Sequence, residues 1–254
     1  MKLLKKLLAT LALVPVLALA NEGGFPLDRA PDRSHDLSAL QNGARLFVNY
    51  CLNCHSAALV RYNRLRDIGL SDDQIRENLL FTGDKVGELM KATMPEKEAK
   101  AWFGAVPPDL SVIVRAKASG EGSGADYVYT YLRTYYQDEG RATGWNNLAF
   151  PNVGMPNVLW ELQGVRKAKF VEEKDPHDEG KMVHKFAGFE QVKAGKLTAQ
   201  QFDEQVADLV GFMEWMAEPV KTKRQQLGVW VLLFLALLVF LTWRLNESYW
   251  KEVK

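Results

Sequence analysis

Apolar residues gather in two long runs, one near each end of the chain. The first run, residues 7–17, follows a lysine-rich start over residues 1–6, and a small-residue Ala-Leu-Ala sequence closes it at 18–20. A basic start, an apolar centre and small residues at the end are the pattern of a secretory signal peptide. We therefore expect residues 1–20 to be a cleaved signal peptide, with an uncleaved N-terminal anchor as the alternative.

The second run, residues 227–243, carries no charge. As a helix it would span roughly 25 Å at about 1.5 Å per residue, slightly less than the roughly 30 Å hydrocarbon core of a bilayer. Trp230 and Trp250 stand where interfacial aromatic residues are expected, and basic residues flank the run on both sides. These flanks argue against a buried core helix. The pattern predicts a transmembrane anchor helix over 225–245.

The signal peptide, and not the charge balance, decides the expected orientation of this anchor. Three basic residues precede the span and three follow it, so neither side has the excess that marks a cytoplasmic loop. A cleaved signal peptide exports the segment that follows it. We therefore expect residues 21–224 to form a domain in an oxidising compartment and residues 246–254 to form a cytoplasmic tail.

The two cysteines of the chain, Cys51 and Cys54, lie in the sequence YCLNCHS, with His55 directly after them. A disulfide across a two-residue gap would constrain the unfolded chain little. A redox dithiol would need a flanking βαβ pattern, and a zinc site would need two further ligands at a suitable spacing; neither is present. C-x-x-C-H matches covalent attachment of a c-type haem, with two thioether bonds and an axial histidine. We expect one haem c here.

Two amphipathic stretches bracket this motif. Gly43, Phe47 and Cys51 recur every four residues, which resembles the N-terminal helix of cytochromes c. A later stretch begins at Thr198, which forms a capping box with Gln201, and continues with an apolar stripe at helical spacing. We expect the glycine and phenylalanine of the first helix to meet the second helix. The fold class predicted is mainly α, a cytochrome c-like haem domain with a long insertion plus the C-terminal transmembrane helix.

The polar segment 169–186 is mixed in charge and interrupts the helical pattern. It is typical of a solvated excursion or hairpin, and a partner-docking surface is the alternative. The formal net charge of the whole chain is only +1, which gives no support to nucleic-acid binding.

A second axial ligand decides whether a haem carries electrons or binds a substrate. Most methionines fill cores, but Met94 and Met155 each precede a proline in a loop-like context. A charged run follows Met94, whereas Phe150, Pro151 and Pro156 give Met155 a more apolar setting. The residues alone favour Met155, with Met94 as the alternative.

Several stretches together resemble the cytochrome c1 family, the haem c subunit of the quinol–cytochrome c oxidoreductase (bc1) complex. They are CLNCHS, AVPPDLSVIVRAK, DYVYTYLRTYY, FPNVGMPN and FMEWMAEP, followed by a single C-terminal span. The resemblance covers the whole mature chain, and PPDLS before a late G-M-P is far more specific than C-x-x-C-H. It implies that Met155 is the axial ligand and that Met94 is a surface or packing residue.

The same resemblance implies the residues of a haem crevice. The PPDLS segment would line it, and a basic residue after that segment would pair with a propionate. Tyr127, Tyr131 and Tyr135 recur at helical spacing, which predicts a helix packed on the haem face, and one of these tyrosines would contact the crevice. Lysine supplies charge without the fork of an arginine, so the choice between two basic positions stays open. The expected crevice residues are Pro108, Leu110, Arg115, Lys117, Tyr127 and Pro156.

The resemblance also implies a function in a bacterial inner membrane, with the haem domain in the periplasm. Electrons would arrive from a Rieske iron–sulfur protein and leave to a cytochrome c acceptor, the span would pack on the cytochrome b subunit, and the complex would be dimeric. The chain would be a redox subunit and not a catalyst by itself. The alternatives are an anchored cytochrome that serves an oxidase or periplasmic dehydrogenase, and a haem enzyme or gas sensor with an open sixth position.

Overall fold

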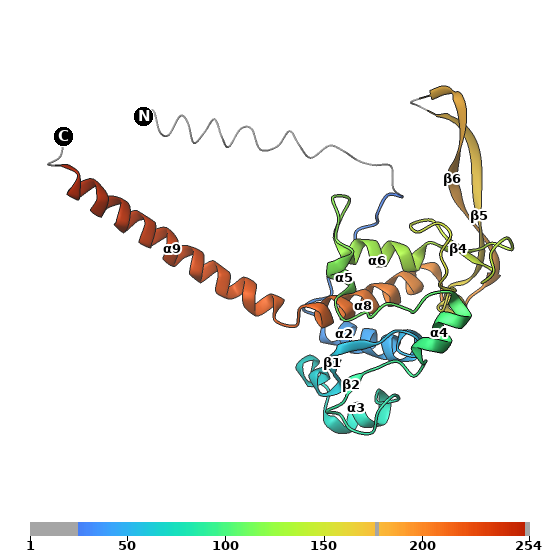
Figure 1. The fold of residues 1–254 in the computed structure, drawn as a ribbon, viewed down its shortest axis with the longest axis horizontal. Helices are drawn as coiled ribbons and strands as arrows, with labels where there is room; N and C mark the ends of the chain where they lie inside the picture. Colours follow the sequence, from blue (N-terminus) through green and yellow to red (C-terminus); the bar gives the residue numbers. More distant parts are fainter. Residues whose placement is uncertain (1–24, 176–177, 252–254) are drawn as a thin grey trace. The chain divides into compact units, whose positions relative to one another are not determined.

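The computed structural model describes residues 25–175 and 178–251. The predicted signal peptide lies outside these residues. The chain forms two compact units, the first ending at Ala217 and the second beginning at Glu218. The first unit holds the motif with both cysteines, and the second consists mainly of one long helix (Figure 1).

Helices α2 (Leu37–Leu46) and α8 (Ala199–Ala217) form the centre of the first unit, and the predicted packing between them is confirmed. A Cβ at Gly43 would lie 2.1 Å from the backbone oxygen of Asp208, so only glycine lets the two backbones approach this closely. One turn later, the rings of Phe47 and Phe212 pack with their centroids 5.6 Å apart. The glycine and the phenylalanine that were expected to meet the second helix therefore define the helix crossing.

Short elements follow α2 and build one side of the unit. A π-helical turn (Phe47–Cys51) continues α2, and strand β1 (Ala57–Arg61) pairs antiparallel with β2 (Leu89–Met90). A 3₁₀ segment (Tyr62–Ile68) and α3 (Asp72–Asn78) lie between these strands in the chain, and a capping box formed by Ser71 and Gln74 begins α3. Helices α4 (Glu96–Phe103) and α5 (Ile113–Ala116) complete this part of the chain.

Helix α6 (Gly124–Arg133) packs on α8 and ends earlier than the tyrosine spacing predicts. Tyr135 belongs to β3 (Tyr135–Gln137), which pairs with β4 (Trp145–Asn147). The side chain of Asn147 donates to the carbonyl of Tyr131 at 2.7 Å and so satisfies a carbonyl that a longer helix would have used. The helix therefore stops through a contact from a distant residue.

A long antiparallel hairpin follows α7 (Trp160–Gln163) and extends from the body of the unit (Figure 1). It consists of β5 (Gly164–Asp175) and β6 (Asp178–Ala194), and it contains the polar segment 169–186. The hairpin expected for that segment is therefore present. Midway along the hairpin, the rings of Phe170 and Phe186 meet with their centroids 6.3 Å apart.

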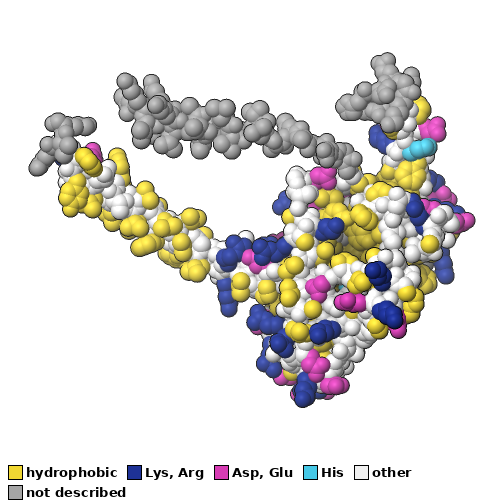
Figure 2. Space-filling view, viewed as in Figure 1, with side chains coloured by type: hydrophobic (Ala, Val, Ile, Leu, Met, Phe, Trp, Pro, Cys, Tyr) yellow, Lys and Arg dark blue, Asp and Glu magenta, His cyan; other side chains and the backbone are white. Residues whose placement is uncertain are grey.

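Helix α9 (Lys221–Tyr249) makes up most of the second unit. Its most apolar window has a mean hydropathy of 2.2, and it is the one helix in the described part of the chain that is long and apolar enough to cross a membrane. Figure 2 shows apolar side chains along its viewed face. At about 1.5 Å per residue its 29 residues span roughly 43 Å, which reaches both headgroup regions.

Candidate haem site

The π-helical turn after α2 ends at Cys51, and the cysteine motif continues from there in a tight turn. The backbone N–H groups of Cys54 and His55 both donate to the carbonyl of Cys51, at 3.1 and 2.8 Å. Cys51 is buried, Cys54 is half-buried, and both are free thiols. Burial raises the pKa of Cys51 to about 12, which disfavours the thiolate that a zinc site or a redox dithiol needs.

His55 is held in one orientation by the PPDLS segment. Its Nδ1 lies 2.7 Å from the carbonyl oxygen of Pro108. A carbonyl only accepts hydrogen bonds, so Nδ1 carries the ring proton and Nε2 keeps a free lone pair. Burial lowers the pKa of His55 and favours the neutral ring, although the Pro108 contact opposes this shift. A neutral, oriented imidazole is the form that binds a haem iron.

The PPDLS segment is itself fastened to the chain that follows His55. Leu110 N–H donates to the carbonyl of Ser56 at 2.8 Å, and the Asp109 carboxylate accepts from Ala58 N–H at 2.7 Å. Asp109 also accepts from the N–H of Ser111 at 2.8 Å, which stabilises the turn before α5. The segment expected to line the crevice is therefore also the support that orients His55. This contact could not be predicted from sequence, because every residue has a backbone carbonyl and the residue type does not show which one will bind His55.

Met155 lies half-buried in the loop between β4 and α7. The hydroxyl of Tyr131 donates to Met155 Sδ at 3.5 Å, and the hydroxyl of Tyr135 lies 3.3 Å from the Met155 carbonyl oxygen. Burial raises the pKa of Tyr131 to about 12 and raises that of Tyr135 as well, so both are neutral donors. Sequence reasoning placed these tyrosines on the haem side but did not find their contacts with Met155.

The predicted crevice residues form a group around Met155 and a group around His55. Lys117 Nζ lies 5.0 Å from the ring centroid of Tyr127 and 5.9 Å from that of Phe150, in the Met155 loop. The ring of Tyr127 stacks on Tyr131, which reaches Met155. Arg115 and Lys117 are both exposed, and it is Lys117 that contacts the ring of Tyr127. Pro108 and Leu110 belong to the His55 group, and Pro156 is half-buried beside Met155.

These residues fit a haem c group. The His55 group offers a neutral nitrogen lone pair, the Met155 group offers a thioether, and Lys117 offers a cation on the Met155 side. Two thiols, at the end of the π-helical turn and just after it, are available for covalent attachment. The neutral His55 ring, with its free Nε2 lone pair, has the protonation state that an axial ligand requires.

Met94 lies next to the cysteine motif, although it is not part of either group. Its backbone N–H donates to the carbonyl of Asn53 at 3.2 Å. Asn53 stands between the two cysteines, so this contact braces the attachment turn. The Met94 side chain is half-buried.

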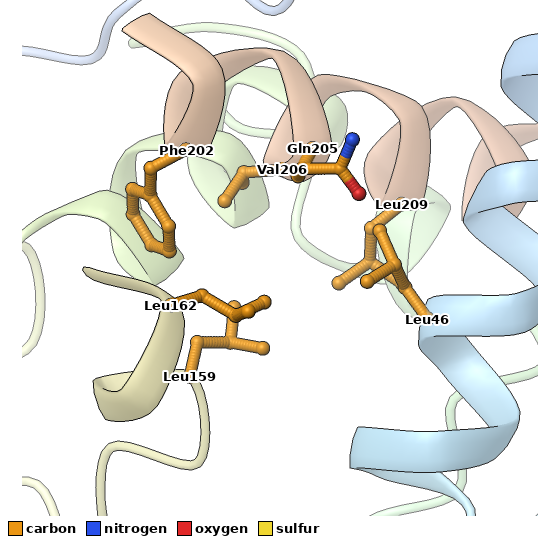
Figure 3. A pocket seen from close by; sticks show the side chains of 7 residues that line it. All are labelled: Leu46, Leu159, Leu162, Phe202, Gln205, Val206 and Leu209. Atoms are coloured by element: carbon orange, nitrogen blue, oxygen red, sulfur yellow. The ribbon is translucent and has the colours of Figure 1, made fainter. Parts of the chain in front are cut away.

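A small pocket lies between α2, α7 and α8, and its lining is apolar except for one glutamine (Figure 3). None of the residues expected to contact the haem lines it. The lining residues are Leu46, Leu159, Leu162, Phe202, Gln205, Val206 and Leu209.

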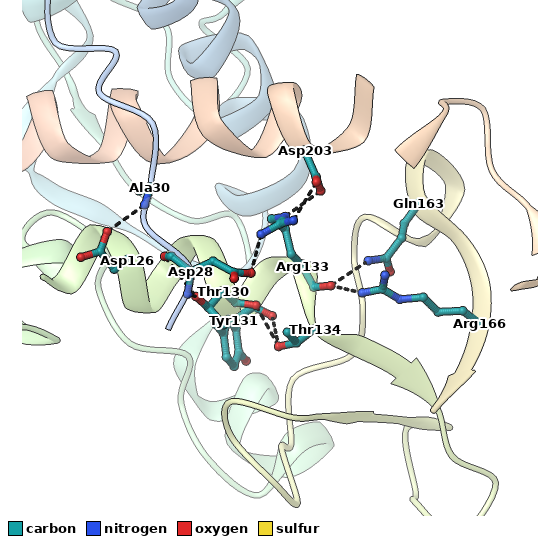
Figure 4. A network of polar contacts seen from close by, with 10 residues as sticks. All are labelled: Asp28, Ala30, Asp126, Thr130, Tyr131, Arg133, Thr134, Gln163, Arg166 and Asp203. Carbon is teal, nitrogen blue, oxygen red and sulfur yellow. Dashed lines mark hydrogen bonds and ion pairs between the residues drawn. The ribbon is translucent and has the colours of Figure 1, made fainter. Parts of the chain in front are cut away.

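A polar network fastens the first described residues to α6 and α8 (Figure 4). Arg133 donates from Nε and Nη2 to both carboxylate oxygens of Asp203 at 2.6 and 2.7 Å, and from Nη1 to Asp28 at 2.6 Å. The N–H of Asp28 donates to Thr130 at 2.8 Å, and that of Ala30 donates to Asp126 at 2.8 Å. The network holds α6, and with it Tyr131, in a fixed position relative to α8.

Comparisons with known proteins agree with this geometry. The family model described as the Cytochrome C1 family matches residues 28–253. The chain is 41% identical to cytochrome c1 of Allochromatium vinosum, covering 98% of this chain and 99% of that protein, and 28% identical to cytochrome c1 of Rhodospirillum rubrum, covering 93% and 92%. It is also 45% identical to a Nitrosomonas europaea protein named ammonia monooxygenase gamma subunit, over 100% of both chains.

The family match and the high coverage confirm the resemblance and the fold class inferred from sequence. They also place the chain in a complex with cytochrome b and a Rieske protein, and they imply a haem c group. Helix α9 fits the membrane anchor of such a subunit. The chain therefore belongs to the cytochrome c1 family, the haem-carrying electron-transfer subunits of the bc1 complex.

Proposed function

We propose that this chain carries one haem c, attached covalently through Cys51 and Cys54, with His55 and Met155 as the axial ligands. The haem supplies one-electron transfer between ferric and ferrous iron. Two protein ligands leave no open position for a substrate, so the site relays electrons and makes no bonds. A thioether ligand stabilises the ferrous state and raises the reduction potential.

The contact between His55 Nδ1 and the Pro108 carbonyl carries this proposal. It leaves Nε2 as the donor of the imidazole and fixes the direction of its lone pair. The hydrogen bonds of Asp109, Leu110 and Ser111 to residues 56–59 hold the carbonyl in place. A solvent-exposed or structural histidine would not need this support.

The electron route and the orientation extend the same proposal. Electrons enter from the Rieske protein and leave to a cytochrome c acceptor, in a dimeric complex in a bacterial inner membrane. The haem domain, residues 21–224, lies in the periplasm, the anchor covers 225–245, and residues 246–254 lie in the cytoplasm. The signal-peptide pattern before the domain and the span after it support this orientation.

A redox-titrated optical spectrum of the complex purified from membranes tests the proposal. We expect a low-spin c-type signal from a chain that keeps its haem on a denaturing gel. Met155→Leu should give a high-spin ferric spectrum and rapid CO binding, whereas Met94→Leu should leave the spectrum unchanged. A low-spin spectrum with an unchanged potential in Met155→Leu would show that another residue is the ligand.

The name of the Nitrosomonas relative raises a second candidate, a haem subunit that serves a membrane monooxygenase. The family match favours the bc1 complex. Co-purification separates the two, because recovery with a monooxygenase and without cytochrome b would support the second candidate.

A further inference from the structure

Two tyrosine hydroxyls meet at Met155. Tyr131 comes from α6 and Tyr135 from β3, and their rings pack edge to face with centroids 5.3 Å apart. Their hydroxyl oxygens are 2.6 Å apart, and either can be the donor. Tyr131 also lies 3.5 Å from Met155 Sδ, and Tyr135 lies 3.3 Å from Met155 O. The pair therefore reaches both the sulfur and the carbonyl oxygen of Met155.

The number of protons limits what this pair can do. Each tyrosine hydroxyl carries one proton. At 2.6 Å the two oxygens must share a hydrogen bond, which uses one of the two protons. One proton remains for Met155. In one arrangement Tyr135 donates to Tyr131, which donates to Sδ. In the other arrangement Tyr131 donates to Tyr135, which donates to the Met155 carbonyl.

The two arrangements differ in their effect on the thioether. A sulfur atom that accepts a hydrogen bond has less electron density to donate to a metal. A weaker donor stabilises oxidised iron less, so a hydrogen bond at Sδ favours the ferrous state. A hydrogen bond at the carbonyl leaves Sδ unchanged.

The surroundings hold both rings in place. Tyr135 is 1% exposed, so bulk water does not compete for its hydroxyl. The ring of Tyr127 stacks on Tyr131 with centroids 6.0 Å apart, and the backbone carbonyl of Tyr135 accepts from Arg166 Nε at 2.9 Å. The protons can therefore rearrange while the heavy atoms stay where they are.

We propose that the hydroxyl pair of Tyr131 and Tyr135 tunes the reduction potential by delivering one hydrogen bond either to Met155 Sδ or to Met155 O. Both are positioning residues that act through Met155. The inference rests on the proposed function, in which Met155 is an axial ligand. It assigns opposite effects to the two hydroxyls: Tyr131 supplies the bond to sulfur, and Tyr135 competes for the same proton.

Single hydroxyl deletions in the whole complex test this inference. Tyr131→Phe removes the donor to Sδ. The equilibrium constant for reduction of ferric to ferrous iron should therefore fall about three- to tenfold, the range for one hydrogen bond. That change equals a potential about 30 to 60 mV lower, at 59 mV per tenfold for one electron. In Tyr135→Phe the remaining hydroxyl always donates to Sδ, so the potential should rise or stay unchanged. Tyr136→Phe, the next residue in β3, is the matched control.

The sulfur-to-iron charge-transfer band of the ferric protein gives a second readout, because it reports the donor strength of Sδ directly. We expect it to move in Tyr131→Phe and not in Tyr136→Phe. A fall in potential of similar size in both Tyr131→Phe and Tyr135→Phe would overturn the inference, because loss of packing or entry of water would explain it. No shift in Tyr131→Phe would overturn it as well.

Met155→Leu separates this inference from the proposed function. If Met155→Leu leaves the spectrum unchanged, the ligand assignment fails and the inference fails with it. If Met155→Leu changes the spectrum while both hydroxyl deletions match Tyr136→Phe, the ligand assignment stands and only the tuning by Tyr131 and Tyr135 is wrong.

Discussion

Substitution of Gly43 by alanine tests the helix crossing on which the haem domain is built. The added Cβ would lie 2.1 Å from the backbone oxygen of Asp208 and 2.6 Å from the Cβ of Phe212. Ordinary contacts of this kind begin above 3 Å, and a backbone oxygen in the middle of α8 cannot turn away. The two helices must therefore separate by about 1 Å, which also disturbs the packing of Phe47 against Phe212.

The expected cost follows from two opposing effects. Overpacking a core costs about 1–3 kcal/mol. Alanine recovers up to about 1 kcal/mol because it forms helices better than glycine. The clash involves backbone and lies about two turns before Cys51, so we place the cost at the upper end and expect a net loss of about 2 kcal/mol. Gly120→Ala is the control, because a Cβ there meets no atom within 4 Å.

Thermal unfolding of the detergent-solubilised chain, followed by its haem absorbance and circular dichroism, measures this cost. The proportion of the chain that carries covalent haem in membranes gives a second measurement. We expect both to fall in Gly43→Ala and neither to change in Gly120→Ala. Equal stability of Gly43→Ala and the wild type would show that the helices do not cross at Gly43.

Three further changes test other parts of the site. Asp109→Asn should loosen the support of His55 and increase CO binding by the ferrous protein; unchanged CO binding would contradict that role. Arg133→Lys loses the bidentate contact with Asp203 and should lower the free energy of unfolding by about 1–3 kcal/mol, measured by thermal unfolding. The control Arg76→Lys, at an exposed position, should cause no loss. Burial raises the pKa of Asp126, but hydrogen bonds from its capping box and from the N-terminal segment outweigh burial and hold it below 3.8. Because the folded pKa is depressed, this stability is present above about pH 4 and is lost as the pH falls through the folded pKa, so Asp126→Asn should flatten the acid limb of a stability–pH curve.

Features that depend on neighbouring residues were predictable. The capping box of Thr198 and Gln201 is present, with both reciprocal hydrogen bonds at 3.0 and 3.2 Å. The apolar stripes of α2 and α8 face each other because the residues at helical spacing share one side of each helix. The long apolar run near the C-terminus forms one helix, because its local pattern alone favours one.

Features made by distant backbone groups were not predictable. Helical spacing extended α6 to Tyr135, but the side chain of Asn147 ends the helix at Arg133. PPDLS was expected as crevice lining, and its carbonyl at Pro108 orients His55. Neither contact involves residue types at a regular spacing.

The sequence by itself predicted the chemistry of this protein: two thiols and a histidine at a haem-attachment spacing, a methionine in a rigid loop, and an apolar span at the end. Each of these is a short pattern whose meaning is local. Only the tertiary structure decided how the donors are oriented and protonated, because the Pro108 carbonyl reaches His55 across 53 positions and the Tyr131 hydroxyl reaches Met155 across 24. Such contacts depend on how the chain packs, and the packing depends on residues throughout the core.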